Sequence, residues 1–144
     1  MNLDLIYTEL IAEHSQYSPY KGELEEATIR ERGHNPSCGD DIHLDICIEE
    51  GKVAKMRFHG VGCAISQAST SMMIELLEGK TLDEAMTLAE TFIKMIKKEI
   101  TSEEELAVLE DAITFQSIST MPARVKCAVL SWYTLKKAIE QLYN

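Results

Sequence analysis

The feature that most constrains this fold is a pair of segments in which apolar and polar residues alternate. Every second residue is apolar over residues 42–49, and the alternation resumes over residues 54–58, with Ala54 as its first apolar position. Side chains along a strand point to opposite faces in turn, so each segment predicts a strand that is buried on one face only. Glu50 and Gly51 lie between the segments and favour a tight turn, which predicts a β-hairpin.

Beyond the hairpin the apolar residues take the spacing of helices. Gly79 is expected to end the first of these helices, and two pairs, Thr81 with Glu84 and Ser102 with Glu105, each fit a capping box that opens another. We expect helices over residues 3–14, 63–79, 81–97, 102–113 and 122–142, a loop over 15–22, a weak edge strand over 26–33 and a connector over 114–121. The first helix carries an apolar stripe of Leu3, Ile6, Tyr7, Leu10 and Ile11.

Strands followed by helices, without the regular alternation that parallel sheets require, predict an α+β fold. We expect a small antiparallel sheet of about three strands, with the helices packed on one of its faces. No repeat, low-complexity tract or linker interrupts the sequence, so residues 1–144 are expected to form a single domain.

The charge balance narrows the classes of partner. The chain has 14 basic and 24 acidic side chains and a formal net charge of −10, which disfavours binding to nucleic acid because phosphates would be repelled. No apolar run is long enough to span a bilayer, and the segment after Met1 lacks the pattern of an export signal. We therefore expect a cytoplasmic protein without a membrane partner, in which the cysteines stay reduced.

Cys38 lies in a turn that is favoured by Pro36 and Gly39, just before the first strand of the hairpin. Asp40 follows two positions later, so a thiolate and a carboxylate come within reach of one metal ion. Asp41 is the competing carboxylate, but Asp40 is in phase with Cys38 along the strand and is the preferred candidate.

Cys63 and Cys127 both stand near predicted helix starts. At the helix N-terminus the dipole favours a thiolate at Cys63, and Arg124 and Lys126 supply cations beside Cys127. Three thiolates and one carboxylate suit a tetrahedral Zn²⁺, which makes Cys38, Asp40, Cys63 and Cys127 the candidate metal ligands. The alternative is that Cys63 and Cys127 are ordinary buried cysteines, which behave as small apolar residues.

The remaining cysteine and the histidines are weaker candidates. Cys47 is out of phase with Cys38, Asp40 and the apolar strand residues, so it is expected on the opposite side of the sheet and outside any metal site. His43 and His59 fall on the polar strand face, where exposure to solvent is the better interpretation. The other two histidines are His14 and His34, and no sequence signal favours either as a ligand.

Three segments, residues 35–40, 60–66 and 123–128, read Asn-Pro-Ser-Cys-Gly-Asp, Gly-Val-Gly-Cys-Ala-Ile-Ser and Ala-Arg-Val-Lys-Cys-Ala. In this order and spacing they strongly resemble the SufU branch of the IscU/NifU-N family of iron–sulfur cluster assembly proteins, and the resemblance extends over nearly the whole chain. It implies an α+β fold with the three cysteines at one tip, and zinc bound by Cys38, Asp40, Cys63 and Cys127. It also implies a sulfurtransferase that accepts persulfide sulfur from a SufS-type cysteine desulfurase, with Cys38 as the acceptor.

Two features favour the SufU type over the IscU type. In the family that the chain resembles, IscU scaffolds carry a histidine just before the last cysteine, whereas this chain has Lys126 there. SufU-like proteins also carry an extra segment between the second and third cysteines, and here an extra helical stretch is expected at residues 102–113. We assign catalysis to Cys38 and Arg124, the latter as the cation on the same helical face as Cys127. Two alternatives stay open: a scaffold that holds a transient [2Fe–2S] cluster and works with other cluster-assembly proteins, and an interaction module with a structural zinc.

Overall fold

The computed structural model describes residues 3–143, with side chains described from residue 9 onward. Its centre is a sheet of three antiparallel strands in the order β1-β2-β3: β1 (Ile29–Asn35), β2 (Asp40–Glu49) and β3 (Lys52–Val61). The predicted hairpin is confirmed as β2 and β3, joined at Glu50 and Gly51. The predicted edge strand is confirmed as β1, which begins three residues later than expected and continues to Asn35.

The phase of β2 is the one that the alternation predicts. Ile42, Leu44 and Ile46 are completely buried on the helix side of the sheet. A register shift between Cys47 and Ile48 then changes which residues of β3 face the core. Val53 is buried and Ala54 only half-buried, so the expectation for Ala54 was wrong: a β-bulge displaces the alternation by one residue.

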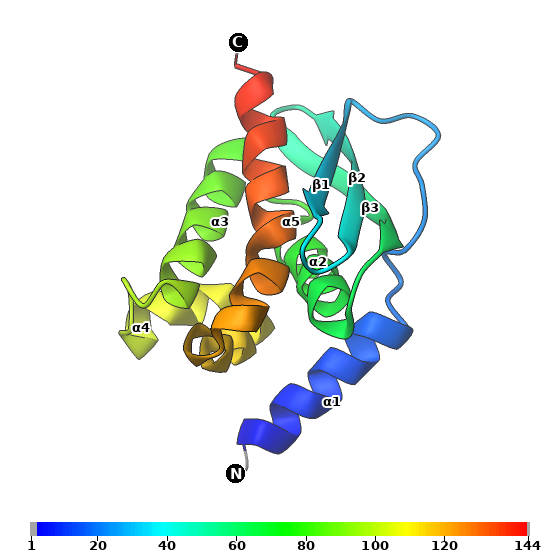
Figure 1. The fold of residues 1–144 in the computed structure, drawn as a ribbon. Helices are drawn as coiled ribbons and strands as arrows, with labels where there is room; N and C mark the ends of the chain where they lie inside the picture. Colours follow the sequence, from blue (N-terminus) through cyan, green and yellow to red (C-terminus); the bar gives the residue numbers. More distant parts are fainter. Residues whose placement is uncertain (1–2, 144) are drawn as a thin grey trace.

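Helices cover one face of the sheet, as predicted (Figure 1). Two of them, α2 (Ala64–Leu77) and α5 (Pro122–Gln141), pack directly on the strands. Further helices, α1 (Leu3–Gln16) and α3 (Leu82–Ile96), pack against α2 and α5 respectively. In α1, Ile11 of the predicted apolar stripe is buried and Leu10 half-buried, while the side chains of Leu3, Ile6 and Tyr7 lie outside the described part of the chain.

Helix ends follow the capping signals in one case and not in another. Thr81 and Glu84 form both hydrogen bonds of a capping box at the start of α3, as predicted. The C-cap of α2 is Glu78, and Gly79 follows it with a positive φ of 89°. Ser102 makes no side-chain cap, so the second predicted capping box was wrong.

Residues 102–121 differ from the expected helix and connector. A single α-turn, α4 (Glu103–Leu106), leads into the 3₁₀ helix η1 (Ala107–Thr120), which is interrupted at Glu110 by a backbone φ of 51°. The buried residues recur every third position: Leu106, Leu109, Ala112, Phe115 and Ile118. A helix with three residues per turn keeps such residues on one face, which explains why this segment is 3₁₀ rather than α-helical.

The second face of the sheet is more covered than the hairpin pattern predicts. Asp45 lies on this face but is only 1% exposed, because residues 17–28 run across it. Its carboxylate accepts hydrogen bonds from the Leu24 N–H at 2.9 Å and from Arg30 Nη1 at 3.0 Å. His43 and His59 stack on the same face with ring centroids 4.9 Å apart, and both are half-buried.

None of the helices between residues 3 and 143 is both long and apolar enough to cross a lipid bilayer.

Candidate metal centre

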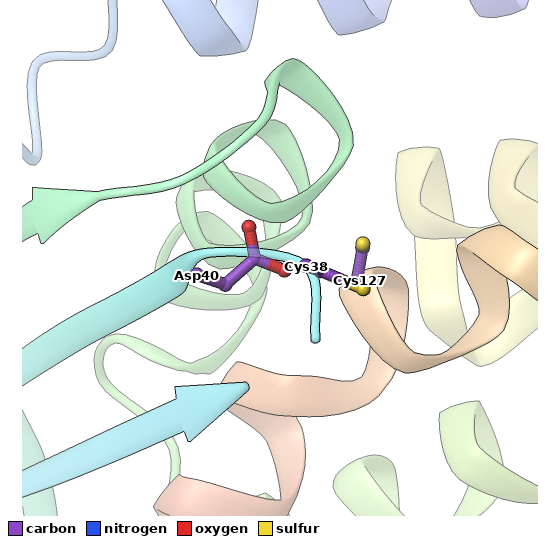
Figure 2. A group of neighbouring side chains, drawn as sticks. All are labelled: Cys38, Asp40 and Cys127. Carbon is purple, nitrogen blue, oxygen red and sulfur yellow. The ribbon is translucent and has the colours of Figure 1, made fainter. Parts of the chain in front are cut away.

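Three of the predicted ligands meet at one tip of the molecule. Cys38 lies in the turn between β1 and β2, Asp40 is the first residue of β2, and Cys127 lies in the second turn of α5. One ligand atom from each of these side chains lies within 4.8 Å of the others. Figure 2 shows Cys127 on α5 close to Cys38 and Asp40, which lie at the start of β2 and in the turn before it. Cys38 is exposed, whereas Asp40 is completely buried and Cys127 is 6% exposed.

Asp40 has one carboxylate oxygen in use and one free for a ligand. Oδ1 accepts a hydrogen bond from the backbone N–H of Cys63 at 3.1 Å. Oδ2 is buried and has no hydrogen-bond partner within the described chain. A buried carboxylate oxygen without a partner is costly, so this atom fits a site that is completed by a cation.

The neighbouring carboxylate is directed elsewhere, as the strand phase predicts. Asp41 lies on the other face of β2, where Arg32 donates two hydrogen bonds to its carboxylate at 2.8 and 2.7 Å. The hydrogen bond from Arg32 is the main cause that lowers the pKa of Asp41 to about 2. Asp41 therefore stays ionised and occupied by Arg32 rather than by the cysteine site.

Cys63 lies at the N-cap of α2, as predicted, but outside the closest group. Its Sγ accepts a hydrogen bond from the backbone N–H of Ser66 at 3.4 Å, which is the capping interaction of the helix. The side chain is exposed and lines a cleft together with Cys127. The role of Cys63 as a fourth ligand stays a prediction.

The environment of Cys127 differs from the one expected. Burial raises the pKa of the Cys127 thiol well above its ordinary value, and the neighbouring Asp40, Cys38 and Cys63 side chains raise it further. The expectation that the surroundings of Cys127 favour its thiolate was therefore wrong for the metal-free protein, because the effect of burial on the pKa is larger than that of the nearby cations. A metal ion that binds Cys127 must displace its proton, which makes binding pH-dependent.

Arg124 and Lys126 are both exposed, and Arg124, unlike Lys126, lines a cleft together with Cys63 and Cys127. The cleft is open, has a volume of about 620 Å³ and lies between α1 and the first turns of α2 and α5. The walls are Ile11, Ala12, Ser15, Gln16, Cys63, Ala64, Ile65, Arg124 and Cys127. A cation at the mouth of this cleft can attract an anionic thiolate or persulfide.

The excluded candidates lie away from the group, as predicted. Cys47 is half-buried on the opposite face of β2, with its nearest polar partner Glu49 at 3.9 Å. His14 is held by Ser71, with Nδ1 2.8 Å from the serine hydroxyl. His43 forms its ion-pair contact with Asp41 rather than with any of the cysteines.

Two thiols and a carboxylate with a free oxygen, and a third thiol close by, match the ligand types of a tetrahedral zinc site. The site is open on the side of Cys38, since that side chain is exposed. An exposed ligand can leave a metal ion with less disruption than a buried one.

Comparison with known proteins defines the class. Residues 6–144 match the NifU-like N terminal domain. The chain is 38% identical over 142 residues to the iron-sulfur cluster assembly scaffold protein IscU of Thermotoga maritima, with 99% of this chain and 98% of that protein covered. It is 36% identical to the zinc-dependent sulfurtransferase SufU of Bacillus subtilis, with 96% and 92% covered.

A solved structure shows the same fold. The crystal structure of FiSufU from Fervidobacterium islandicum AW-1, described as a scaffold protein for the SUF system, aligns with a TM-score of 0.86 and 38% identity. The alignment covers 94% of this chain and 97% of that one. The chain therefore belongs to the NifU-N family of iron–sulfur cluster assembly proteins, which includes IscU and SufU.

Proposed function

We propose that this protein is a zinc-dependent sulfurtransferase that accepts persulfide sulfur from a SufS-type cysteine desulfurase for iron–sulfur cluster assembly. The observation that carries this proposal is the contrast within the group of three. An exposed thiol, Cys38, stands beside two buried ligands, Asp40 and Cys127. Such a group can hold a metal through its buried members while it presents one sulfur to another protein.

Cys38 is the member best placed to react. A hydrogen bond from the Cys38 N–H to the Asn35 carbonyl, at 3.1 Å, closes its turn, and Gly39 adopts a positive φ of 73° there. Within the described chain, the thiol has a hydrogen-bond contact with the hydroxyl of Ser37, at 3.8 Å, besides its neighbours in the group. A turn residue can move toward a partner with less disruption than a buried helix residue such as Cys127.

Sulfur transfer to Cys38 is a thiol–persulfide exchange. The Cys38 thiolate attacks the outer sulfur of the desulfurase persulfide, and a new S–S bond forms on Cys38. The S–S bond within the desulfurase breaks, and its cysteine leaves as a thiolate. Sulfur and electrons balance without an external oxidant or reductant.

Zinc would be held by Asp40 Oδ2, Cys127, Cys63 and Cys38, and when bound it keeps coordinating thiols in the thiolate form. Asp40 and Cys127 form the fixed part of this set because both are buried. Cys38 would be the member of the set that could detach, while the other ligands would hold the ion.

The zinc-bound function is tested first by composition and turnover. The protein purified without added iron should be colourless with about one zinc per chain, and it should raise the turnover of a SufS-type desulfurase with cysteine as substrate. Zinc-loaded protein without any effect on the desulfurase would leave only an interaction module with a structural zinc, and would contradict the proposal.

A second function is supported by the similarity to the Thermotoga maritima scaffold protein. Its identity to this chain, 38%, is slightly higher than the 36% of the Bacillus subtilis sulfurtransferase. The same cysteines could hold a transient [2Fe–2S] cluster for transfer to other cluster-assembly proteins. Brown protein with sulfide-dependent absorbance and no effect on desulfurase turnover would favour this scaffold function over sulfur transfer.

Asp40→Ala is expected to weaken zinc binding and to slow sulfur acceptance, because it removes the free buried oxygen of the site. Zinc loss should be smaller than for a cysteine variant, since carboxylates bind zinc less tightly than thiolates. Asp41→Ala is the matched control: it removes partly exposed ion-pair contacts with Arg32 and His43 on the other face of β2, and such contacts contribute little. Zinc content and the rate of persulfide formation measure both effects, and damage confined to Asp41→Ala would show that the wrong carboxylate was chosen.

Arg124→Gln is expected to slow sulfur acceptance by about tenfold, because it removes the cation beside the cysteines that attracts an anionic persulfide. Zinc content should not change. Lys126→Gln removes the same charge two residues away, outside the cleft, and should keep most of the rate. Rates measured at low and high salt check the electrostatic cause, since the difference between the variants should shrink at high salt. Equal rates for the two variants at low salt would rule out a specific role for Arg124.

A further inference from the structure

Ser66 is a buried hydroxyl that has no partner beside the candidate metal centre. It lies in the first turn of α2 and is 1% exposed, and its Oγ has no hydrogen-bond partner within the described chain. Buried hydroxyl groups without partners are uncommon because the lost hydration is not replaced. Ser66 therefore calls for an explanation of the same kind as the free oxygen of Asp40.

The Ser66 hydroxyl and the Asp40 carboxylate border the same small space. A Cβ atom at Gly62 would lie 3.2 Å from Asp40 Oδ1 and 3.2 Å from Ser66 Oγ, so the missing side chain of Gly62 leaves room for both. Cys63 links them through the backbone: its N–H donates to Asp40 Oδ1 at 3.1 Å, and its Sγ accepts from the Ser66 N–H at 3.4 Å.

The usual acceptors for a serine hydroxyl in a helix are already engaged here. Such a hydroxyl commonly donates to the carbonyl three or four residues earlier. At Ser66 these carbonyls belong to Cys63 and Gly62, and both accept hydrogen bonds from Gln67, at 3.0 and 2.8 Å. The Asp40 carboxylate, which borders the same space beside Gly62, is a further acceptor for the Ser66 hydroxyl.

We propose that Ser66 is a positioning residue for Asp40, whose hydroxyl donates to the carboxylate and holds Oδ2 toward the thiols when a metal ion is bound. This inference rests on the proposed zinc function. Carboxylates that bind metals are themselves hydrogen-bonded, and removal of such an outer partner typically lowers metal affinity by about 10- to 100-fold.

Zinc affinity, measured by competition with a chromophoric chelator, tests this role without any activity assay. Ser66→Ala should weaken zinc binding by about tenfold. Ser131→Ala is the matched control, because Ser131 is also 1% exposed and its Oγ also has no partner. Neither variant should lower the melting temperature of the metal-free protein, since each removes only a buried hydroxyl that makes no hydrogen bond within the described chain.

A double-mutant cycle distinguishes positioning from a general structural effect. In the Asp40→Ala background, Ser66→Ala should cause no further loss of zinc affinity, because the carboxylate on which it acts is gone. An equal loss in both backgrounds, or no loss in the wild-type background, would overturn the role of Ser66. If Asp40→Ala itself left zinc affinity unchanged, the ligand set of the proposed function would fail, and the role of Ser66 with it.

Discussion

Cys38→Ala should abolish the stimulation of a cysteine desulfurase by this protein, whereas Cys47→Ala should preserve it. Cys38 lies in the turn just before β2 and Cys47 lies within β2. Cys38 is exposed next to Asp40 and Cys127, whereas Cys47 lies on the other face of the strand. Removal of the attacking sulfur leaves no acceptor, so the expected loss is complete rather than partial. Release of alanine from cysteine by the desulfurase measures the effect.

The pair of variants also controls for folding. Both replace a thiol-bearing side chain by a methyl group, and neither thiol is fully buried, so both variants should keep the same secondary structure and, in the metal-free state, a closely similar melting temperature. Normal turnover with Cys38→Ala, or its loss with Cys47→Ala, would contradict both the strand phase argument and the choice of acceptor.

Cys127→Ala should lose bound zinc and much of the thermal stability of the metal-loaded protein. Cys127 is the buried thiol of the group, and its replacement removes one of the two fixed ligands. Zinc that binds only the folded chain stabilises it by about 4 kcal/mol when free zinc is about a thousand times Kd. Metal analysis and thermal unfolding with and without a chelator measure the two effects.

Metal removal supplies the internal control for this variant. A chelator should lower the melting temperature of the wild-type protein to near that of Cys127→Ala, and it should leave Cys127→Ala almost unchanged. If Cys127→Ala kept a full equivalent of zinc, or if the chelator destabilised both proteins equally, Cys127 would not be a ligand.

The hairpin, its turn and the orientation of Cys38, Asp40 and Cys47 could be predicted from sequence because one local property decides them. Strand residues alternate between faces, and the apolar set fixes which face is buried. The same reasoning separated Asp40 from Asp41, which the structure places on opposite faces of β2. It was wrong at Ala54, where a bulge shifts the phase by one residue.

The segment at residues 102–121 shows where a usable signal was missed. Apolar residues recur there at every third position from Leu106 to Ile118, a period of three that fits a 3₁₀ helix better than the α-helix inferred from Ser102 and Glu105. A capping pattern describes only one end of a helix, whereas the period of the buried face describes its whole length.

Other features depend on contacts between distant segments. The elevated pKa of Cys127 reflects burial by the assembled fold, which a cation count over neighbouring residues does not capture. The burial of Asp45 requires residues 17–28 to cross the sheet. Ser66 ends the motif at residues 60–66, but the role proposed for it rests on its place beside Gly62 and Asp40 in the folded chain.

Direct transfer of sulfur tests the central claim most closely. A desulfurase that carries its persulfide, separated from free cysteine, is mixed with the zinc-loaded protein, and the added sulfur is located by mass spectrometry of the digested chain. The account predicts one additional sulfur, on the peptide that contains Cys38, together with loss of the persulfide from the desulfurase. Added sulfur mainly on Cys47, or a desulfurase that keeps its persulfide in the presence of this protein, would contradict it.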